Sequence, residues 1–131
     1  MKKIINVVCA IIIDNNKVFA AQRASSGEVG LYWEFPGGKI EAGEDAKEAL
    51  IREIEEELAW DITAGDLFTT IHHEYETFII NLSAYICSVK NHDFKLKEHL
   101  AFKWLRIKDL NKVKFAAADK KIVSKLEKFN L

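Results

Sequence analysis

The most informative part of the sequence reads Trp33-Glu34-Phe35-Pro36-Gly37-Gly38-Lys39-Ile40-Glu41-Ala42-Gly43-Glu44, followed by Asp45-Ala46-Lys47-Glu48-Ala49-Leu50-Ile51-Arg52-Glu53-Ile54-Glu55-Glu56-Glu57-Leu58. Its first part is rich in residues that interrupt regular structure, since five of the chain's six glycines and its only proline lie between residues 27 and 43. The second part has neither, and Asp45 followed by Glu48 is a capping-box pattern. The stretch therefore predicts an irregular turn that leads into a helix over residues 45–58.

Three glutamates of this helix fall within one arc of its surface. At about 100° per residue, Glu53, Glu56 and Glu57 flank the apolar stripe that contains Leu50 and Ile54. The helix dipole disfavours a carboxylate in the last turn by about 0.3–1 kcal/mol, and the carboxylates also repel one another. A bound cation makes the electrostatic energy of the clustered carboxylates favourable. Clustered carboxylate oxygens without a supporting cysteine or a suitably spaced histidine favour Mg²⁺ or Mn²⁺ over zinc.

A second interpretation of the same glutamates needs no ligand. Arg52 lies four residues from both Glu48 and Glu56, so ion pairs worth about 0.2–0.5 kcal/mol each could tie together a solvated acidic face. The helix would then be purely structural, in an unrelated α/β domain. On the residues alone, both interpretations stay open.

Outward from this stretch, the chain alternates strands and helices. Asn6 interrupts the apolar run after the basic start, so we interpret that segment as a strand and not as a signal peptide. Segments rich in β-branched and aromatic residues predict strands over residues 4–13, 17–22, 67–75, 78–89 and 101–107. Apolar residues at helical spacing predict a second helix over residues 116–129. We expect a single mixed α/β domain over residues 1–131.

Composition and charge exclude several classes of protein. The chain is 49% apolar, which excludes disorder, and its net charge of −1 gives no reason to expect a nucleic acid or a membrane as partner. The charge is uneven, however: residues 41–57 sum to −6 and residues 90–131 to +7. The lysines of the basic part are interspersed with apolar residues, as on a solvated helix face. Cys9 and Cys87 fall in predicted strands as small buried hydrophobes, which fits a reducing cytoplasm.

The spacing of the central stretch resembles the signature of the Nudix hydrolases. Gly38 is followed after five residues by Glu44, and after seven more by Arg52-Glu53-Ile54-Glu55-Glu56-Glu57. One departure is clear, because the glycine and aliphatic residue that usually end the signature are Ala59 and Trp60 here. An alanine in a left-handed helix cap costs about 1 kcal/mol. The resemblance implies the Nudix fold, an α-β-α sandwich around a central mixed β-sheet.

The resemblance also implies a metal site that binds a pyrophosphate group. Its ligands would be the Gly37 carbonyl and the carboxylates of Glu53, Glu56 and Glu57, with Arg52 orienting a glutamate. Bound Mg²⁺ would screen the phosphates and generate hydroxide near neutral pH. Arg23 and Lys39 are basic and near the loop, which suits phosphate contacts, although an arginine at a strand end is as often solvent-facing.

The whole chain is similar to the MutT-type branch of this family. In that branch a glutamate before the last strand completes the metal site, a role that falls to Glu98, and either Glu53 or Glu98 would be the general base. Without the family, Glu98 would be a surface glutamate in a charged loop. Asp119 lies where the branch reads the base of the nucleotide; without the family it would be a helix N-cap. Phe35 and Phe78 are candidates for stacking on the base, with packing in the core as the alternative.

The resemblance implies an Mg²⁺-dependent pyrophosphohydrolase that converts a nucleoside triphosphate to the monophosphate and pyrophosphate. An oxidised purine such as 8-oxo-dGTP is the first expectation, and CTP or a 5-substituted cytidine triphosphate is the alternative. A nucleotide-sensing Nudix module without turnover is a further alternative, although such modules typically lose acids of the signature. We expect a cytoplasmic enzyme with a small-molecule substrate, and a monomer, with a dimer left open.

Overall fold

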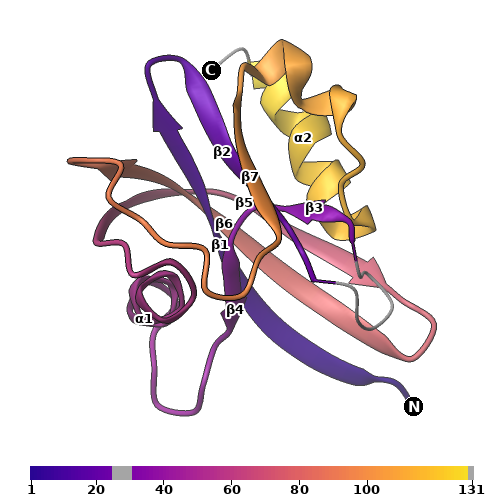
Figure 1. The fold of residues 1–131 in the computed structure, drawn as a ribbon. Coiled ribbons are helices and arrows are strands. Elements are labelled where there is room, and N and C mark those ends of the chain that lie inside the picture. The colour runs from indigo at the N-terminus through magenta and orange to yellow at the C-terminus, as the bar shows by residue number, and fades with distance from the viewer. Residues whose placement is uncertain (25–30, 130–131) are drawn as a thin grey trace.

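The computed structural model describes residues 1–24 and 31–129, and in it a mixed sheet lies between two helices (Figure 1). The elements follow in the order β1 (Lys3–Asp14), β2 (Lys17–Gln22), β3 (Trp33–Glu34), β4 (Gly37–Lys39), α1 (Ala46–Leu58), β5 (Ile62–Glu74), β6 (Phe78–Val89), β7 (Ala101–Leu105), the 3₁₀ helix η1 (Ile107–Lys112) and α2 (Ala117–Phe129). The main strand order is β3-β2-β1-β6-β5, with β4 paired to β1 and β7 to β2. Because β1 runs parallel to β6 and antiparallel to β2 and β4, the expected mixed sheet is confirmed.

Strand β1 is buried on both faces because a helix covers each of them. Its side chains alternate between the faces: Val8, Ala10 and Ile12 belong to the hydrophobic cluster on the α1 side, and Cys9 and Ile11 to the cluster on the α2 side. The two helices lie on opposite sides of the sheet in Figure 1. The α-β-α sandwich expected from the family resemblance is therefore confirmed.

Local sequence explains most element boundaries. Asn15 and Asn16, with φ of 51° and 63°, form the tight turn between β1 and β2.

Strand β5 begins at Ile62, five residues before the predicted start. Its pairing with β6 is irregular between Ala64 and Thr69, and a Cβ at Gly65 would lie 2.7 Å from the Ile86 carbonyl oxygen. This irregularity breaks the alternation on which the sequence prediction depends.

The glycine-rich stretch, the end of β7 and the start of α2 also differ from the predictions. The glycine-rich stretch contains two short strands, β3 and β4, and β4 pairs with β1 so closely that a Cβ at Gly37 would collide with the Val8 carbonyl. β7 ends at Leu105, two residues before the predicted end, because the 3₁₀ helix η1 begins at Ile107. α2 begins at Ala117, one residue after the predicted start. Gly27 and Gly30 lie outside the described residues. No helix in the described parts of the chain is long and apolar enough to cross a membrane.

Candidate active site

A cleft of about 600 Å³ brings together most of the residues singled out from the sequence. Its lining combines acidic groups of α1 with the β3–β4 segment and with apolar side chains of β1 and β6. Eight of the predicted site residues line it: Arg23, Phe35, Gly37, Lys39, Glu53, Glu57, Phe78 and Asp119. A glycine-rich segment, an acidic helix and a strand far along the chain thus meet at one place.

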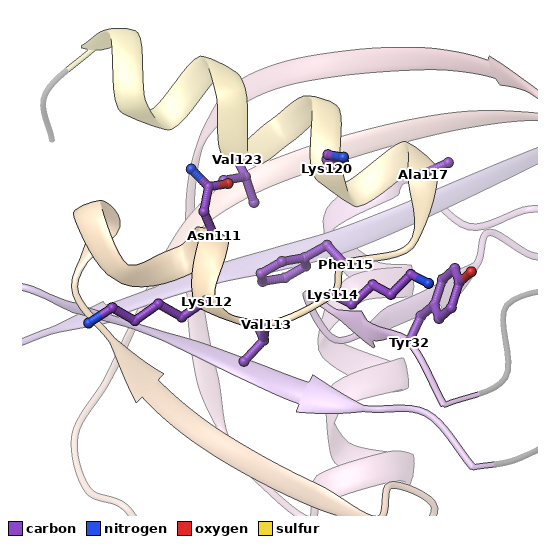
Figure 2. Close-up of a pocket in the computed structure, with 9 residues that line it drawn as sticks. All are labelled: Tyr32, Asn111, Lys112, Val113, Lys114, Phe115, Ala117, Lys120 and Val123. Atoms are coloured by element: carbon purple, nitrogen blue, oxygen red, sulfur yellow. The ribbon is translucent and has the colours of Figure 1, made fainter.

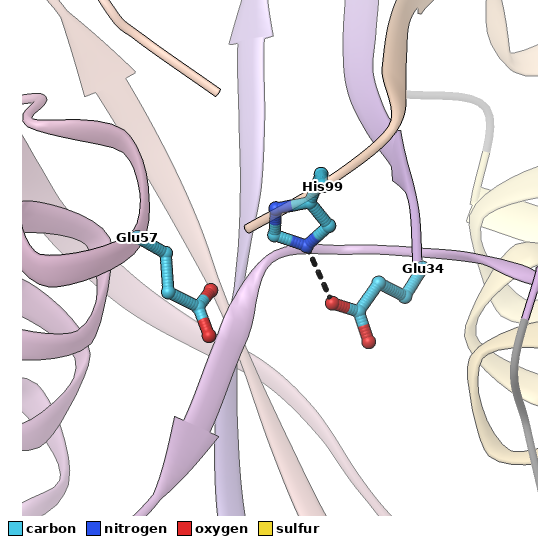
Figure 3. Close-up of side chains that lie close together, drawn as sticks. All are labelled: Glu34, Glu57 and His99. Atoms are coloured by element: carbon cyan, nitrogen blue, oxygen red, sulfur yellow. Dashed lines mark hydrogen bonds and ion pairs between the residues drawn. The ribbon is translucent and has the colours of Figure 1, made fainter. Parts of the chain in front are cut away.

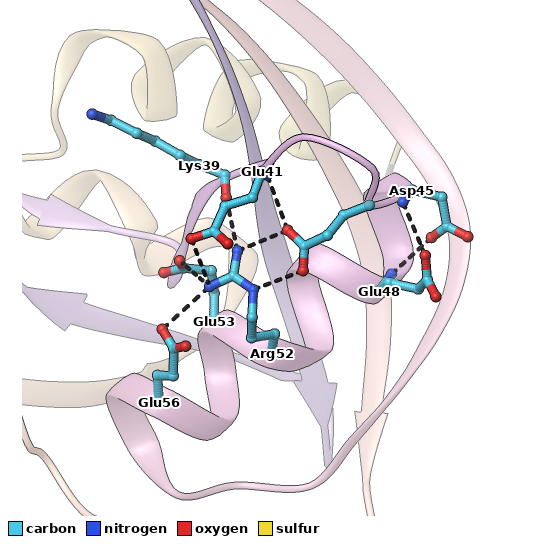
Figure 4. Close-up of polar contacts among 8 residues, drawn as sticks. Lys39, Glu41, Asp45, Glu48, Arg52, Glu53 and Glu56 are labelled. Carbon is cyan, nitrogen blue, oxygen red and sulfur yellow. Dashed lines mark hydrogen bonds and ion pairs between the residues drawn. The ribbon is translucent and has the colours of Figure 1, made fainter.

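The N-terminus of α1 is fixed by the predicted capping box. Asp45 Oδ1 accepts a hydrogen bond from the Glu48 N–H at 2.8 Å, and Glu48 Oε1 accepts one from the Asp45 N–H at 3.0 Å (Figure 4). Glu48 is therefore engaged at the cap. The pairing of Arg52 with Glu48, expected for a purely solvated acidic face, is wrong.

Arg52 connects the turn before α1 to the acidic face of the helix (Figure 4). Its Nε and Nη2 donate to the two carboxylate oxygens of Glu44 at 2.7 and 2.9 Å. Its Nη1 donates to Glu53 at 2.8 Å and to Glu56 at 3.2 Å, so the expected pairing with Glu56 is confirmed. The hydrogen bonds from Arg52, followed by one from the Glu41 backbone, lower the pKa of Glu44 to about 2. Arg52 thus holds the Glu53 carboxylate in one orientation.

Glu53 lies directly against the backbone of β4. A Cβ at Gly38 would collide with the Glu53 carboxylate, so only glycine leaves room for that group at this position. The carboxylate is partly buried beside the cleft. Burial is the main cause that raises the pKa of Glu53, and the hydrogen bond from Arg52 opposes the shift.

Glu57 has the opposite environment to Glu44. Its Oε1 atom is buried and has no hydrogen-bond partner among the described residues. Burial, followed by the nearby carboxylates of Glu34, Glu53 and Glu98, raises the pKa of Glu57 to about 9. A buried carboxylate oxygen without a partner is costly. A cation bound at this position would remove the cost.

The segment 90–100 is docked against the C-terminal end of α1. The backbone N–H groups of Lys95 and Lys97 donate to the carbonyls of Leu58 and Glu57 at 2.8 and 3.1 Å, which satisfies two of the last carbonyls of the helix. Although alanine replaces the usual glycine, Ala59 still ends the helix in the left-handed conformation, with φ of 50°. These contacts bring Glu98 beside Glu57, in a smaller cavity of about 160 Å³.

Glu34 and His99, which line this smaller cavity, were not identified as functional from the sequence. His99 Nε2–H donates to Glu34 Oε2 at 2.8 Å (Figure 3). Arg23 Nη1 donates to the other oxygen, Glu34 Oε1, at 2.9 Å. Glu34, Glu57 and His99 each offer one possible metal ligand, and these three atoms lie within 4.8 Å of one another. The only sequence signals were that Glu34 stands in the glycine-rich stretch and that His99 follows Glu98.

Asp119 is buried at the N-terminal turn of α2. Because the helix begins at Ala117, the N-cap interpretation of Asp119 is wrong. Its Oδ1 instead accepts a hydrogen bond from the Phe35 N–H at 3.0 Å. Burial, followed by the charge of Glu34, raises the pKa of Asp119 to about 8. The carboxyl group lines the same cleft as Glu53 and Glu57.

The remaining candidates differ in how they contact the cleft. The side chain of Phe35 is only 2% exposed and its ring stacks on Phe115, so its alternative interpretation as a core residue is confirmed. Phe78 is half-buried and stacks on Tyr75, with ring centroids 4.9 Å apart, and both line the cleft. Lys39 is exposed and its side chain extends away from the Arg52 cluster (Figure 4). Glu56 is 57% exposed and is not among the lining residues.

A second cavity, of about 650 Å³, contains none of the predicted site residues (Figure 2). It lies between Tyr32, the end of η1 and the first turns of α2, and is lined in part by Lys112, Lys114 and Lys120. Lys114 Nζ lies 4.9 Å from the centroid of the Tyr32 ring. No carboxylate is among the described residues that line this second cavity.

Known proteins resemble this chain along nearly its whole length. It is 37% identical over 118 residues to the CTP pyrophosphohydrolase of Escherichia coli (strain K12), which covers 89% of this chain and 87% of that protein. It is 30% identical over 128 residues to the 8-oxo-dGTP diphosphatase of the same strain, covering 98% and 99%. The solved structure of the DNA mismatch repair protein MutT (family Nudix hydrolase) from methicillin-resistant Staphylococcus aureus 252 has a TM-score of 0.79 and 45% identity, covering 98% of this chain and 99% of that one. Residues 7–125 match the NUDIX domain model, and the chain belongs to this family.

Proposed function

We propose that this protein hydrolyses a nucleoside triphosphate to the monophosphate and pyrophosphate, using Mg²⁺, with Mn²⁺ as a substitute. The observation that carries the proposal is the buried and unpartnered Oε1 of Glu57, which lies in a cleft with Glu53 and the backbone of Gly37 and Gly38. The pyrophosphohydrolase and diphosphatase names of the relatives support the same reaction class. Intact acidic residues argue against a sensor without turnover.

The residues present suit a hard divalent cation. Glu53, Glu56, Glu57 and Glu98 offer carboxylate oxygens and Gly37 a carbonyl oxygen, the donors that Mg²⁺ prefers. When bound, Mg²⁺ would screen the phosphate oxygens and lower the pKa of a water molecule. Of these ligands, Glu56 would have to turn from its exposed position beside Arg52.

Side chains of the protein would orient the metal ligands, accept the proton of the attacking water and contact the phosphates. Arg52 keeps Glu53 oriented, and Glu53 or Glu98 takes the proton from the attacking water. Arg23 lines the cleft and is already held by Glu34, so it presents a fixed positive charge to the phosphates. Lys39 supplies a mobile one from the exposed edge of β4.

We propose that the base of the nucleotide lies between Asp119 and the stacked rings of Phe78 and Tyr75, because these groups line the part of the cleft formed by α2 and β6. An oxidised purine such as 8-oxo-dGTP is the first candidate substrate. CTP or a 5-substituted cytidine triphosphate is the second, favoured by the likeness to a CTP pyrophosphohydrolase. Both bases carry N–H donors for the carboxyl group of Asp119.

The test is a comparison of kcat/KM for 8-oxo-dGTP, dGTP, CTP and 5-methyl-dCTP in the presence of Mg²⁺, with pyrophosphate and monophosphate both measured. We expect a preference for 8-oxo-dGTP over dGTP. A preference for a cytidine substrate would overturn the oxidised-purine assignment. Absence of pyrophosphate from every substrate would favour the sensor, and unchanged Mg²⁺ affinity in Glu56→Gln and Glu57→Gln would favour a structural helix.

We further propose that the protein acts in the cytoplasm as a monomer, on free nucleotides and not on a nucleic acid. Cys9 and Cys87 support a reducing compartment, because both are buried and neither is in a disulfide. Burial raises the pKa of the Cys87 thiol to about 12, so this group is a poor nucleophile. Size-exclusion chromatography with light scattering tests the oligomeric state, and a concentration-independent dimer mass would contradict the proposal.

A further inference from the structure

His99 is held in an unusual way for a histidine in a loop. Its side chain is only 4% exposed, and Nε2–H donates to Glu34, whose other oxygen accepts from Arg23. The second ring nitrogen, Nδ1, is buried and has no hydrogen-bond partner among the described residues. The ring is thus fixed through one nitrogen, while the lone pair of the other is available for a ligand.

Glu57 and Arg23, which line the same cavity, also have buried atoms without a partner among the described residues: the acceptor Oε1 of Glu57 and the donor Nε of Arg23. Figure 3 shows the His99 ring between the carboxylates of Glu57 and Glu34. Two buried acceptors, Glu57 Oε1 and His99 Nδ1, therefore occur beside one cavity of about 160 Å³, which Arg23, paired with Glu34, also lines. Each would be relieved by the same positively charged group.

We propose that His99 Nδ1 and Glu57 Oε1 bind a borderline divalent metal ion such as Co²⁺ or Zn²⁺, with Glu34 orienting the imidazole. A metal-binding histidine almost always donates its other ring N–H to a carboxylate or carbonyl, which is the arrangement of His99 and Glu34. Ligand-to-metal distances of about 2.0–2.2 Å allow two ligand atoms of one ion to lie up to about 4.4 Å apart. One ligand atom from each of Glu34, Glu57 and His99 already lies within 4.8 Å of the other two, and side-chain rotation would bring His99 Nδ1 and Glu57 Oε1 to the same ion.

The imidazole nitrogen distinguishes this site from one made of oxygens alone. Mg²⁺ prefers oxygen ligands, whereas imidazole suits the transition metals and zinc. The proposed site shares Glu57 with the Mg²⁺ site of the proposed function but adds a donor that Mg²⁺ does not favour. It follows that His99 sets which metal binds, and the inference holds whether or not a nucleoside triphosphate is the substrate.

The decisive measurement is the proton NMR spectrum of the full chain loaded with Co²⁺. A coordinated imidazole gives a strongly shifted N–H signal that disappears in D₂O, and here it would arise from Nε2–H of His99. We expect this signal in the wild type and its loss in His99→Gln. His92→Gln is the matched control, because His92 also pairs with a carboxylate, at 2.7 Å from Asp14, but is exposed. A spectrum of the wild type without such a signal at saturating Co²⁺ would overturn the proposal.

Calorimetric titration gives a second, independent readout. We expect His99→Gln to raise the Kd for Co²⁺ by at least 10-fold and the Kd for Mg²⁺ by less than 3-fold, and Glu34→Gln to raise the Kd for Co²⁺ by about 10–100-fold. Equal changes for both ions would contradict the proposal. If His99→Gln does not fold, selective ¹⁵N labelling of histidine in the wild type decides the question, because Co²⁺ must then shift His99 strongly and His92 little. Loss of hydrolysis with a normal Co²⁺ spectrum would count against the proposed function alone.

Discussion

Glu44 and Glu57 are carboxylates at the two ends of α1, and the protein treats them in opposite ways. Arg52 binds both oxygens of Glu44, and the pKa of Glu44 falls to about 2. Glu57 keeps an unpartnered oxygen, and the pKa of Glu57 rises to about 9. At the first end the chain supplies its own cation. At the second end the charge of Arg23 opposes the rise in the Glu57 pKa, but Arg23 donates to Glu34, and further carboxylates lie around the unpartnered oxygen of Glu57. The comparison separates a structural part of the signature from the part that is left for a ligand.

Removing the charge at the unpaired end is the strongest test of this comparison. We expect Glu57→Gln to lower kcat/KM for the preferred triphosphate by about 10²–10³-fold, the size that follows loss of one group that stabilises transition-state charge. The measurement is the initial rate of pyrophosphate release at saturating Mg²⁺. Glu55→Gln is the control, because Glu55 is exposed on the same turn. A change of less than about 3-fold in Glu57→Gln would remove Glu57 from the site.

Disrupting the paired end should have a smaller effect. In Arg52→Ala, Glu53 loses the donor that orients it, so we expect kcat/KM to fall by about 10–100-fold, as when a partner behind a metal ligand is removed. Arg52→Lys should restore little, since a lysine cannot bind both oxygens of Glu44 and also reach Glu53. The same rate assay, with circular dichroism to verify folding, checks both variants. Full activity in Arg52→Ala would show that Glu53 needs no orientation.

The two ends also differ in how far the sequence could predict them. The helix, its capping box and the pairing of Arg52 with Glu56 depend on contacts within a few residues, and periodicity predicts such contacts. The positions of Glu34 and His99 depend on β3 and on the docking of residues 90–100 against the last carbonyls of α1. Backbone contacts between segments so distant in sequence leave no periodic signal.

Asp119 illustrates the same limit in another way. The local sequence pattern predicts that Asp119 is a helix N-cap. In the structure the helix starts at Ala117, and the Asp119 carboxyl group accepts a hydrogen bond from the Phe35 N–H across the core. The signal that linked Asp119 to the cleft was the family resemblance, not its neighbours in sequence. Tertiary contacts override the local preference at the residues that the site uses.

The comparison also predicts how stability depends on pH. A carboxyl whose pKa is raised in the folded state favours folding while it is protonated, so stability falls as pH rises from about 4.5 towards 9. Each unit of pKa difference is worth about 1.4 kcal/mol. We expect the Tm of the metal-free wild type to fall over this range, by more than about 4 °C, and to fall less in Glu57→Gln. Thermal unfolding in EDTA measures both. Added Mg²⁺ should restore the wild type at pH 8, and a Tm that is flat with pH would contradict the unpaired state of Glu57.

The smallest effect concerns Asp119, which like Glu57 is a buried carboxyl with a raised pKa, of about 8, but which accepts hydrogen bonds from the backbone N–H groups of Phe35 and of Asp119 itself. Below that pH the carboxyl group carries a proton and can donate a hydrogen bond as well as accept one; above it, the group can only accept. The ratio of kcat/KM for 8-oxo-dGTP to that for CTP should therefore change between pH 6.5 and 9, by up to about 10-fold, since one hydrogen bond is worth about 0.5–1.5 kcal/mol. Asp119→Asn keeps a donor and an acceptor at every pH, so its ratio should stay constant. Because the ratio cancels ionisations, such as those of Glu53 and Glu57, that act on both substrates alike, an equal pH dependence in wild type and variant would show that Asp119 does not contact the base.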